Sequence, residues 1–168
     1  ALAYRQERDL DFVVARLFNT VGPRQSGRYG MVVARFVQAA VANRPLEIHG
    51  DGTQTRTFCH VQDTIRALAR LMESPATTGE IYNVGSRNWL SIAELAARVL
   101  ELTGSSSELH HVPYEQVYGT GIDDMLHRVP AIEKIEAAIG WAPTRTLDEI
   151  LEDVIAYERG LVAGEPLS

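Results

Sequence analysis

The sequence predicts an α/β fold, and two patterns carry that prediction. Short apolar runs typical of strands alternate along the chain with segments whose apolar residues recur at helical spacing. Capping boxes of the Ser/Thr-x-x-Glu type and Gly-rich turns mark the boundaries between these elements. A length of 168 residues with 45% hydrophobic residues is enough for a core that needs neither disulfides nor metal.

The first third of the chain alternates between the two kinds of element. Residues 1–8 resemble the end of a helix, and the nearly continuous apolar run at 12–18 is typical of a buried strand in a parallel sheet. Apolar residues at helical spacing predict a helix over 31–42. Residues 46–49 alternate like a short strand and lead into a Gly-Asp-Gly turn at 50–52.

The next helix is expected to begin at Asp63, a residue type well suited to capping a helix N-terminus. Ile65, Leu68, Met72 and the Ala residues between them are expected to form its buried stripe. A strand is predicted at residues 81–84, where the apolar pattern returns after a glycine.

Two capping boxes predict the remaining helices. The box at residues 91–94 opens a helix that is expected to end at Gly104. The box at 146–149 opens the last helix, with an expected end at Gly160.

Composition excludes several classes of partner. Sixteen basic and 22 acidic residues give a formal charge of -6, and no run of like charge forms a phosphate-binding stripe, so we expect no nucleic-acid partner. Cys59 is the only cysteine, which excludes an intramolecular disulfide and a cysteine-built zinc site. Because no apolar stretch is long enough to span a membrane and no signal-peptide pattern opens the chain, we expect no membrane partner and a cytoplasmic location.

Motifs that carry catalytic chemistry are few. The sequence holds no Gly-x-Ser-x-Gly elbow, no His-Glu-x-x-His helix and no phosphate loop. Residues 119–124 start like a dinucleotide fingerprint but lack its third glycine, so we interpret them as a polar loop. His110 and His111 would point to opposite faces of a strand and cannot chelate one ion. Cys59 is either a thiol activated by His60 or, as we favour, a small buried hydrophobe.

Arginines give a stronger indication, because several occur at strand ends or in loops that contain Gly or Pro. Loop arginines on a rigid α/β scaffold suit bidentate recognition of phosphate, although many loop arginines are only solvated. The residues in question are Arg16, Arg24, Arg28, Arg56 and Arg128.

Four blocks of sequence together resemble the C-terminal half of the extended short-chain dehydrogenases, which are NAD-dependent nucleotide-sugar epimerases, dehydratases and decarboxylases. They are Ala-Arg-Leu-Phe-Asn-Thr-Val-Gly-Pro-Arg at 15–24, Gly-Asp-Gly-Thr-Gln-Thr-Arg-Thr-Phe-Cys-His-Val-Gln-Asp at 50–63, Tyr-Asn-Val-Gly at 82–85, and the segment 128–143. The order and spacing of the blocks indicate the family without indicating which member it is.

The resemblance implies a two-part enzyme, with an N-terminal Rossmann domain that holds NAD and a C-terminal domain that binds a nucleotide sugar, most simply a UDP-sugar. Residues 1–22 would then be a helix end and the last strand of the Rossmann sheet, and residues 23–168 the substrate-binding domain. The catalytic Tyr-x-x-x-Lys pair of the family is expected upstream of Ala1, because Tyr4 is followed by Arg8 where the pair requires lysine. We therefore expect a fragment that is inactive alone, taken from a parent that is a homo-oligomer.

The resemblance also implies ligands, residue by residue, with no catalytic and no metal-binding residue in this chain. Those expected to bind the substrate are Asn19, Arg56 and Arg128 at the diphosphate and Glu47, Ile48 and His49 around the base. Those expected near the nicotinamide end of NAD are Leu17, Val21, Gly22 and Pro23. Ala131 stands where the family often carries an acidic residue that meets the ribose, which implies a weaker hold on the ribose.

The interpretation is therefore the substrate-binding part of an NAD-dependent sugar-nucleotide epimerase or dehydratase. In that chemistry a tyrosinate removes a hydroxyl proton from the sugar while hydride passes to NAD. Epimerisation, elimination of water and loss of carbon dioxide remain open. A non-catalytic nucleotide-sugar binder or a protein-interaction module is the alternative, because the same arginines would be present in it.

Overall fold

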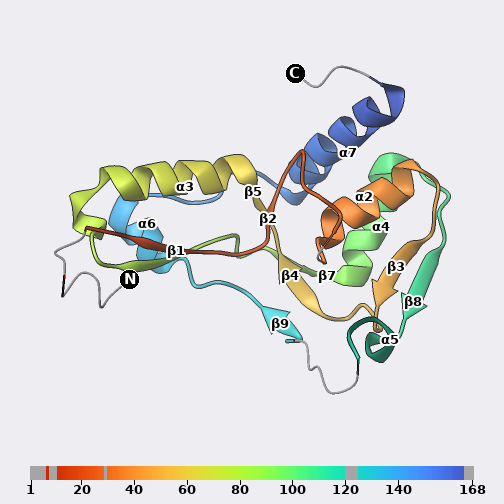
Figure 1. Ribbon diagram of the computed structural model, residues 1–168, viewed down its shortest axis with the longest axis horizontal. Helices are drawn as coiled ribbons and strands as arrows, with labels where there is room; N and C mark the ends of the chain where they lie inside the picture. Colours follow the sequence, from red (N-terminus) through yellow and green to blue (C-terminus); the bar gives the residue numbers. More distant parts are fainter. Residues whose placement is uncertain (1–6, 8–10, 29, 120–124, 165–168) are drawn as a thin grey trace. The chain divides into compact units, whose positions relative to one another are not determined.

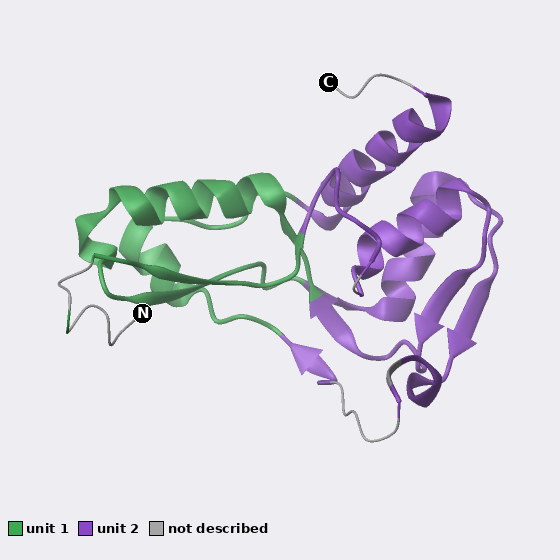
Figure 2. Cartoon of the chain, in the orientation of Figure 1, with its two compact units in different colours: residues 1–20, 57–88, 129–145 green, residues 21–56, 89–128, 146–168 purple. Residues whose placement is uncertain are grey.

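The computed structural model describes Glu7 and residues 11–28, 30–119 and 125–164 (Figure 1). These residues form two compact units, each assembled from three separate stretches of chain (Figure 2). The first unit comprises residues 1–20, 57–88 and 129–145, and the second comprises residues 21–56, 89–128 and 146–168. The expected helix end at 1–8, apart from Glu7, and most of the polar loop at 119–124 lie outside the described residues. The division of the chain at residue 22 remains a prediction.

The first unit contains the strand that the apolar run predicts. Strand β1 (Val14–Leu17) pairs in parallel with β6 (Ile81–Val84), with Leu17 opposite Val84. β1 is only half-buried, and the side chain of Leu17 is 50% exposed, because among the described residues β1 pairs with β6 alone. The expected strand is therefore confirmed, but its expected burial is not.

A short pair of strands leads into the main helix of this unit. β2 (Thr20–Val21), which begins in the unit, pairs with β5 (Cys59–His60). Helix α3 (Val61–Glu73) follows β5 directly, and the side chain of His60 accepts a hydrogen bond from the backbone N–H of Gln62. His60 is therefore the N-cap, and the prediction that Asp63 caps this helix is wrong.

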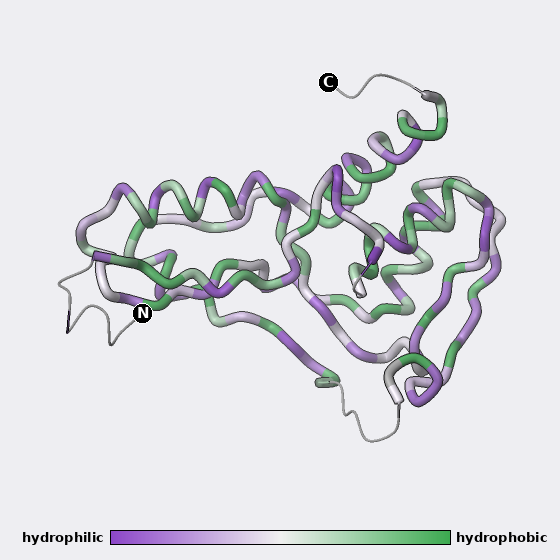
Figure 3. Tube along the Cα trace, viewed as in Figure 1, coloured by the Kyte–Doolittle hydropathy of each residue, from purple (hydrophilic) through white to green (hydrophobic). Residues whose placement is uncertain are grey.

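The buried stripe of α3 also differs from the prediction. Ile65 is 59% exposed and Met72 is 81% exposed, whereas Ala67 and Leu71 are buried. Figure 3 shows polar and apolar residues alternating along α3. Of the predicted stripe, Ala67 is buried as expected, but Leu71 packs into the core in place of Ile65 and Met72.

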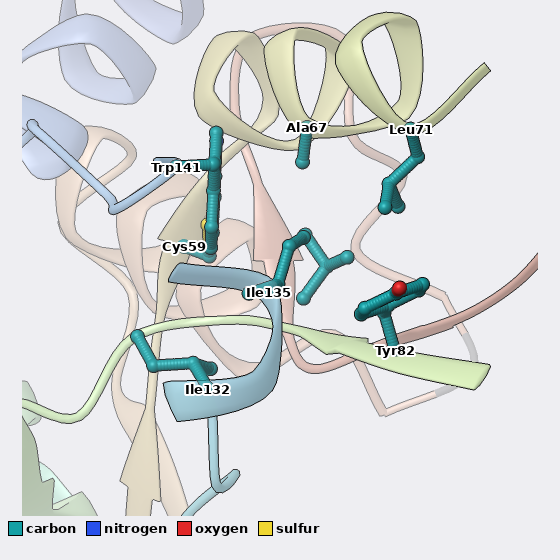
Figure 4. Packing of buried hydrophobic residues seen from close by; sticks show 8 residues of the cluster. Cys59, Ala67, Leu71, Tyr82, Ile132, Ile135 and Trp141 are labelled. Atoms are coloured by element: carbon teal, nitrogen blue, oxygen red, sulfur yellow. The ribbon is translucent and has the colours of Figure 1, made fainter. Parts of the chain in front are cut away.

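The core of the first unit lies between α3, β6 and α6 (Glu133–Ile139). Ala67 and Leu71 point from α3 toward Tyr82 of β6 and Ile135 of α6 (Figure 4). Trp141 is fully buried beside them, and its indole nitrogen donates to the backbone carbonyl of Asp63 at 3.0 Å. A 3-10 turn, η1 (Pro75–Thr77), joins α3 to β6.

The second unit is built from three helices that pack on one another, α2 (Val32–Val41), α4 (Ile92–Thr103) and α7 (Leu147–Ala163). Both predicted capping boxes are present, at the N-termini of α4 and α7. Helix α7 continues through Gly160 and ends at Gly164, whose φ of 73° is left-handed, so the predicted end at Gly160 is wrong.

Two small sheets complete this unit. β3 (Leu46–His49) pairs in parallel with β8 (Leu109–Val112) and packs on α2 and α4. A three-stranded sheet has the order β7 (Trp89–Ser91), β4 (Thr55–Thr57), β9 (His127–Arg128), and β4 contributes its first two residues to this unit. A single-turn helix, α5 (Tyr114–Tyr118), follows β8. Parallel pairs and packed helices confirm the predicted α/β class.

Within the part of the chain that the structure describes, none of the helices combines the length and the apolar character needed to cross a membrane.

Candidate functional site

Two arginines lie side by side in the small sheet of the second unit. β4 and β9 are parallel, and Arg56 is the registered partner of Arg128. Registered residues on neighbouring parallel strands project from the same face, with backbones about 5 Å apart. Both side chains are half-buried, and the Nε atom of Arg128 is completely buried. The sheet thus brings together the two arginines that were predicted to bind one diphosphate.

Backbone carbonyls hold the guanidinium group of Arg56 in place. Arg56 Nη1 donates to the carbonyls of Thr55 at 2.7 Å and Met125 at 2.9 Å. One step back in the register, the hydroxyl of Thr55 lies 2.9 Å from His127 Nδ1. The two carbonyls orient the guanidinium group of Arg56 and carry no formal charge themselves.

The two carboxylates that lie nearest to Arg56 in the sequence, those of Asp51 and Asp63, are bonded to other groups. The Asp51 carboxylate accepts hydrogen bonds from the backbone and hydroxyl of Thr53, and these hold its pKa below the usual range. The Asp63 carboxylate lies in the first unit and accepts from Thr144 and the backbone of Arg145. Asp124, the carboxylate nearest to Arg128 on its N-terminal side in the sequence, lies outside the described residues.

The strand predicted to flank a nucleotide base is β3. Leu46 and Ile48 are completely buried, Glu47 is exposed and His49 is half-buried, as the alternating sequence predicted. The side chain of Ile48 belongs to the core, and its expected role at a base remains a prediction. Glu47 and His49 are the two residues of the set whose side chains reach the surface.

Two residues that sequence reasoning missed hold the edge of β3. Arg35 of α2 donates through Nη2 to the carbonyl of Glu47 at 3.0 Å, and its Nη1 lies 2.6 Å from His49 Nε2. Buried Gln54 donates to the carbonyl of His49 at 2.8 Å. No local pattern marks either residue, because both contacts join separate elements.

The environment of His49 favours its neutral form. Burial lowers the pKa of His49, the nearby Arg35 guanidinium lowers it further, and Glu47 acts in the opposite direction. The net direction is below the ordinary histidine value.

Asn19 lies in the first unit at the carboxyl end of β1. Its φ of 40° is left-handed, a conformation that asparagine adopts more readily than most residues. Its amide Nδ2 donates to the carbonyl of Thr57 at 2.7 Å, which uses one of its two hydrogens. Its predicted role at a diphosphate remains a prediction.

The residues predicted near the nicotinamide differ in exposure. Leu17 is half-exposed and Pro23 is exposed, whereas Val21 and Gly22 are buried. Leu17 ends a strand of a parallel pair, and ligands of open α/β sheets bind at the carboxyl ends of their strands. The exposed apolar side chain at this end suits the flat face of a nicotinamide ring. The assignment of all four residues remains a prediction.

The minor candidates in the sequence do not form a chemical centre. Cys59 is buried, and burial is the main cause of the raised pKa of its thiol, so its interpretation as a small hydrophobe is favoured over that of a reactive thiol. His110 and His111 lie on β8, where His110 contacts Glu108 and His111 Nδ1 lies 3.0 Å from the Gly50 carbonyl. The described residues include no cluster of three side chains that could hold a metal ion.

A cavity of about 520 Å³ opens in the first unit between the start of β1 and the end of α3. Its lining residues include Phe12, Leu71 and Thr78, and none of the predicted ligand residues is among them. The cavity is therefore not the predicted substrate site.

Comparison with known proteins identifies the family. The model of the NAD dependent epimerase/dehydratase family matches residues 1–85. A UDP-N-acetyl-alpha-D-glucosaminuronate decarboxylase from Bacillus cytotoxicus is 36% identical over 151 residues, which cover 89% of this chain and 47% of that protein. UDP-glucuronic acid decarboxylase 1 from Xenopus tropicalis is 34% identical over 157 residues, 94% of this chain and 35% of its own length. The chain belongs to the NAD dependent epimerase/dehydratase family.

Solved structures agree in fold. A UDP-glucuronic acid 4-epimerase from Bacillus cereus, crystallised with UDP-glucuronic acid and NAD, matches 95% of this chain with a TM-score of 0.84 and 26% identity. A UDP-glucose 4-epimerase from Thermotoga maritima, crystallised with UDP-glucose, matches 95% of it with a TM-score of 0.85 and 28% identity. The chain spans 48% and 50% of these two structures. It therefore corresponds to between about a third and a half of the length of the proteins it resembles.

Proposed function

We propose that this chain binds the sugar nucleotide in a protein that converts a UDP-sugar with the help of NAD. Arg56 and Arg128 would bind the diphosphate, and β3 would flank the base. Asn19 would donate to the diphosphate from its place after β1. Residues 1–22 and 23–168 would serve the cofactor and the substrate, respectively.

The registered pair of arginines on β4 and β9 is the single observation that carries this proposal. Like charges on directly neighbouring strand positions repel each other, so the pair favours an anionic ligand that is bound across both positions. A diphosphate offers two negative charges and several acceptor oxygens to two planar forks, which match it in charge and in hydrogen-bond geometry. Two arginines spaced by one strand separation suit a diphosphate better than a single carboxylate.

The base end of the proposed ligand is supported by the chemistry of β3. The N–H groups of Leu46 and Gly50 donate to the carbonyls of Glu108 and Val112, so alternate residues direct their backbone toward β8. Glu47 and His49 direct theirs toward the opposite edge, where Arg35 and Gln54 occupy the carbonyls. The half-buried ring of His49 offers a flat face for a base to stack on.

The cofactor proposal rests on the family and on the end of β1. NAD, when bound, accepts and returns a hydride. Leu17, Val21, Gly22 and Pro23 would pack near its nicotinamide end, and the half-exposed side chain of Leu17 would help to exclude water there. The residues that remove the sugar proton are not among those proposed for this chain. Relatives with decarboxylase and epimerase names support UDP-uronic acids as the first substrates to test.

Calorimetric titration with UDP-glucuronic acid, UDP, uridine and ADP tests the proposal. We expect UDP and UDP-glucuronic acid to bind. Uridine should bind far more weakly because it has no diphosphate, and ADP should bind more weakly than UDP because it carries adenine in place of uracil. Equal affinity for uridine and UDP would contradict the diphosphate assignment. Equal affinity for ADP and UDP would contradict the assignment of β3 to the base.

A further inference from the structure

Arg35 makes an unusually complete set of contacts to the strand proposed to flank the base. It projects from α2, 14 residues before His49 in the sequence, and contacts both residues of β3 whose side chains reach the surface. Its guanidinium carbon also lies 5.8 Å from the centre of the Phe36 ring. Its Nε atom is buried and finds no hydrogen-bond partner among the residues that the structure describes. Such a side chain is fixed in place rather than merely solvated.

The contact with His49 determines where the ring carries its proton. An arginine side chain has hydrogen-bond donors only, so at 2.6 Å the Nε2 atom of His49 has to be the acceptor. A histidine whose Nε2 accepts is neutral and carries its proton on Nδ1. The second fork of Arg35, on the carbonyl of Glu47, fixes the guanidinium relative to the strand.

We propose that Arg35 is a positioning residue for the base: it holds His49 as a neutral ring with the proton on Nδ1 and in one orientation. This inference rests on the proposed function and adds to it a residue that never touches the sugar nucleotide. A neutral, oriented ring presents the same stacking face and the same donor over the pH range in which a free histidine would titrate.

Charged and titratable groups around His49 agree with this assignment. Burial and the cationic neighbour both lower the pKa of His49. The other groups come from every element packed on β3: Glu47 on the strand itself, His110 and His111 on β8, Asp51 and Tyr114 beside Gly50, and Glu94, Arg98 and Glu101 on α4. Of these, Glu94 is bonded to Ser91, and Arg98 is bonded to Asp148 and Glu101. Arg35 is thus the cation in direct contact with the ring.

The first arm of the test uses the free protein and needs no ligand. Nitrogen-15 NMR of the histidine rings reports the tautomer and the protonation state of His49 between about pH 5 and pH 8, around the ordinary histidine pKa of about 6.5. We expect the neutral Nδ1–H form in the wild type, with protonation shifted to lower pH. In Arg35→Ala the protonation of His49 should move to higher pH, because Glu47 remains and the cation is gone. A proton on Nε2, or an unshifted titration in the wild type, would overturn the inference whatever the protein binds.

The second arm measures the affinity for UDP across the same pH range. Arg35→Ala should weaken UDP binding by about two- to tenfold at pH 6, the effect of losing one ordinary hydrogen bond, and less at pH 8. Arg35→Lys keeps the charge but can serve only one of the two acceptors, so it should lie in between and remain available if the alanine variant unfolds. Arg159→Ala, which removes another arginine that bonds a backbone carbonyl, is the matched control and should leave affinity unchanged.

The two arms separate the failure of this inference from the failure of the proposed function. If Arg35→Ala and Arg35→Lys bind UDP as the wild type does at every pH while Arg56→Ala does not, Arg35 has no positioning role and the diphosphate assignment stands. If the folded wild type does not bind UDP at all, both the proposed function and the role toward a base are overturned.

Discussion

Replacing either paired arginine by alanine should weaken the binding of UDP by about 10- to 150-fold. Each guanidinium would provide charge-assisted hydrogen bonds to the diphosphate, and hydrogen bonds to charged groups contribute about 1.5 to 3 kcal/mol. That free energy converts to the stated factor at about 1.4 kcal/mol per tenfold. Lysine at either position should recover only part of the loss, because an ammonium keeps the charge but lacks the planar fork.

The geometry of the pair predicts a different effect on stability. Two unit charges separated by the strand spacing of about 5 Å repel by about 0.8 kcal/mol in bulk water and by about 3 kcal/mol at an effective dielectric of 20. Arg56→Ala removes that repulsion in the free protein while also removing bonds to the carbonyls of Thr55 and Met125. These effects oppose each other, so we expect the free energy of unfolding to change by less than about 1 kcal/mol.

Calorimetric titration with UDP and thermal unfolding, run on the same variants, separate the two effects. The variants are Arg56→Ala, Arg56→Lys, Arg128→Ala and Arg128→Lys. Arg70→Ala serves as the control, because Arg70 is exposed and makes one long contact of 3.5 Å to the Gly140 carbonyl. If both alanine variants lose stability but bind UDP as tightly as the wild type per folded molecule, the arginines are structural and the reasoning is refuted.

Two further predictions concern the stability of each unit. Asp63→Asn should lower the free energy of unfolding by about 2 to 3 kcal/mol at pH 7, because it removes the charge that several groups stabilise. Burial raises the pKa of Asp63, but the bonds from Arg145 and Thr144 and the charge of Arg66 outweigh burial and lower the pKa overall. A carboxyl group whose pKa is depressed in the folded state contributes its full stability above the unfolded pKa of about 3.9, and that stability is lost as the pH falls toward the native pKa. The difference between the free energies of unfolding of the variant and the wild type, measured with denaturant, should therefore shrink in acid. An equal difference at pH 7 and in acid would contradict this. Gly52→Ala should lower the free energy of unfolding by about 2 to 3 kcal/mol, and Gly104→Ala by about 1 kcal/mol. Both glycines have a positive φ, but a Cβ at Gly52 would lie 3.0 Å from Ile48 and 3.1 Å from Ala93, whereas a Cβ at Gly104 would meet nothing within 4 Å. Equal melting temperatures for the two variants would show that this crowding is unimportant.

Local signals were sufficient to predict most of the elements. The capping boxes at 91–94 and 146–149 start helices because a side chain and a backbone N–H three residues apart satisfy each other without help from the rest of the fold. The alternation at 46–49 predicted β3, because one face of that strand is buried and the other is not.

Helix α3 shows where local signals failed. Ile65, Leu68 and Met72 share a spacing with Thr64, Ala67 and Leu71, and apart from the alanines the prediction took the first set because its side chains are larger. The structure buries the second set, against partners such as Trp141, which follows α3 by more than 60 residues. Asp63 was assigned to the cap because its actual partner, Thr144, is 81 residues away. A tertiary contact, rather than a propensity, decides both outcomes.

The candidate site could be predicted only as far as residue types and resemblance reached. Arg56 and Arg128 were identified from the sequence, but their register on β4 and β9 depends on a parallel pairing across 72 residues. Arg35 carried no signal, because an arginine on an amphipathic helix is usually solvated. Its role follows from the approach of α2 to β3, which only the folded chain contains.

A crystal structure of the protein with UDP-glucuronic acid tests the central proposal most directly. We expect the diphosphate oxygens within hydrogen-bonding distance of the guanidinium groups of both Arg56 and Arg128, with the base against the edge of β3 that carries His49. A well-defined ligand whose diphosphate contacts neither arginine would contradict the account.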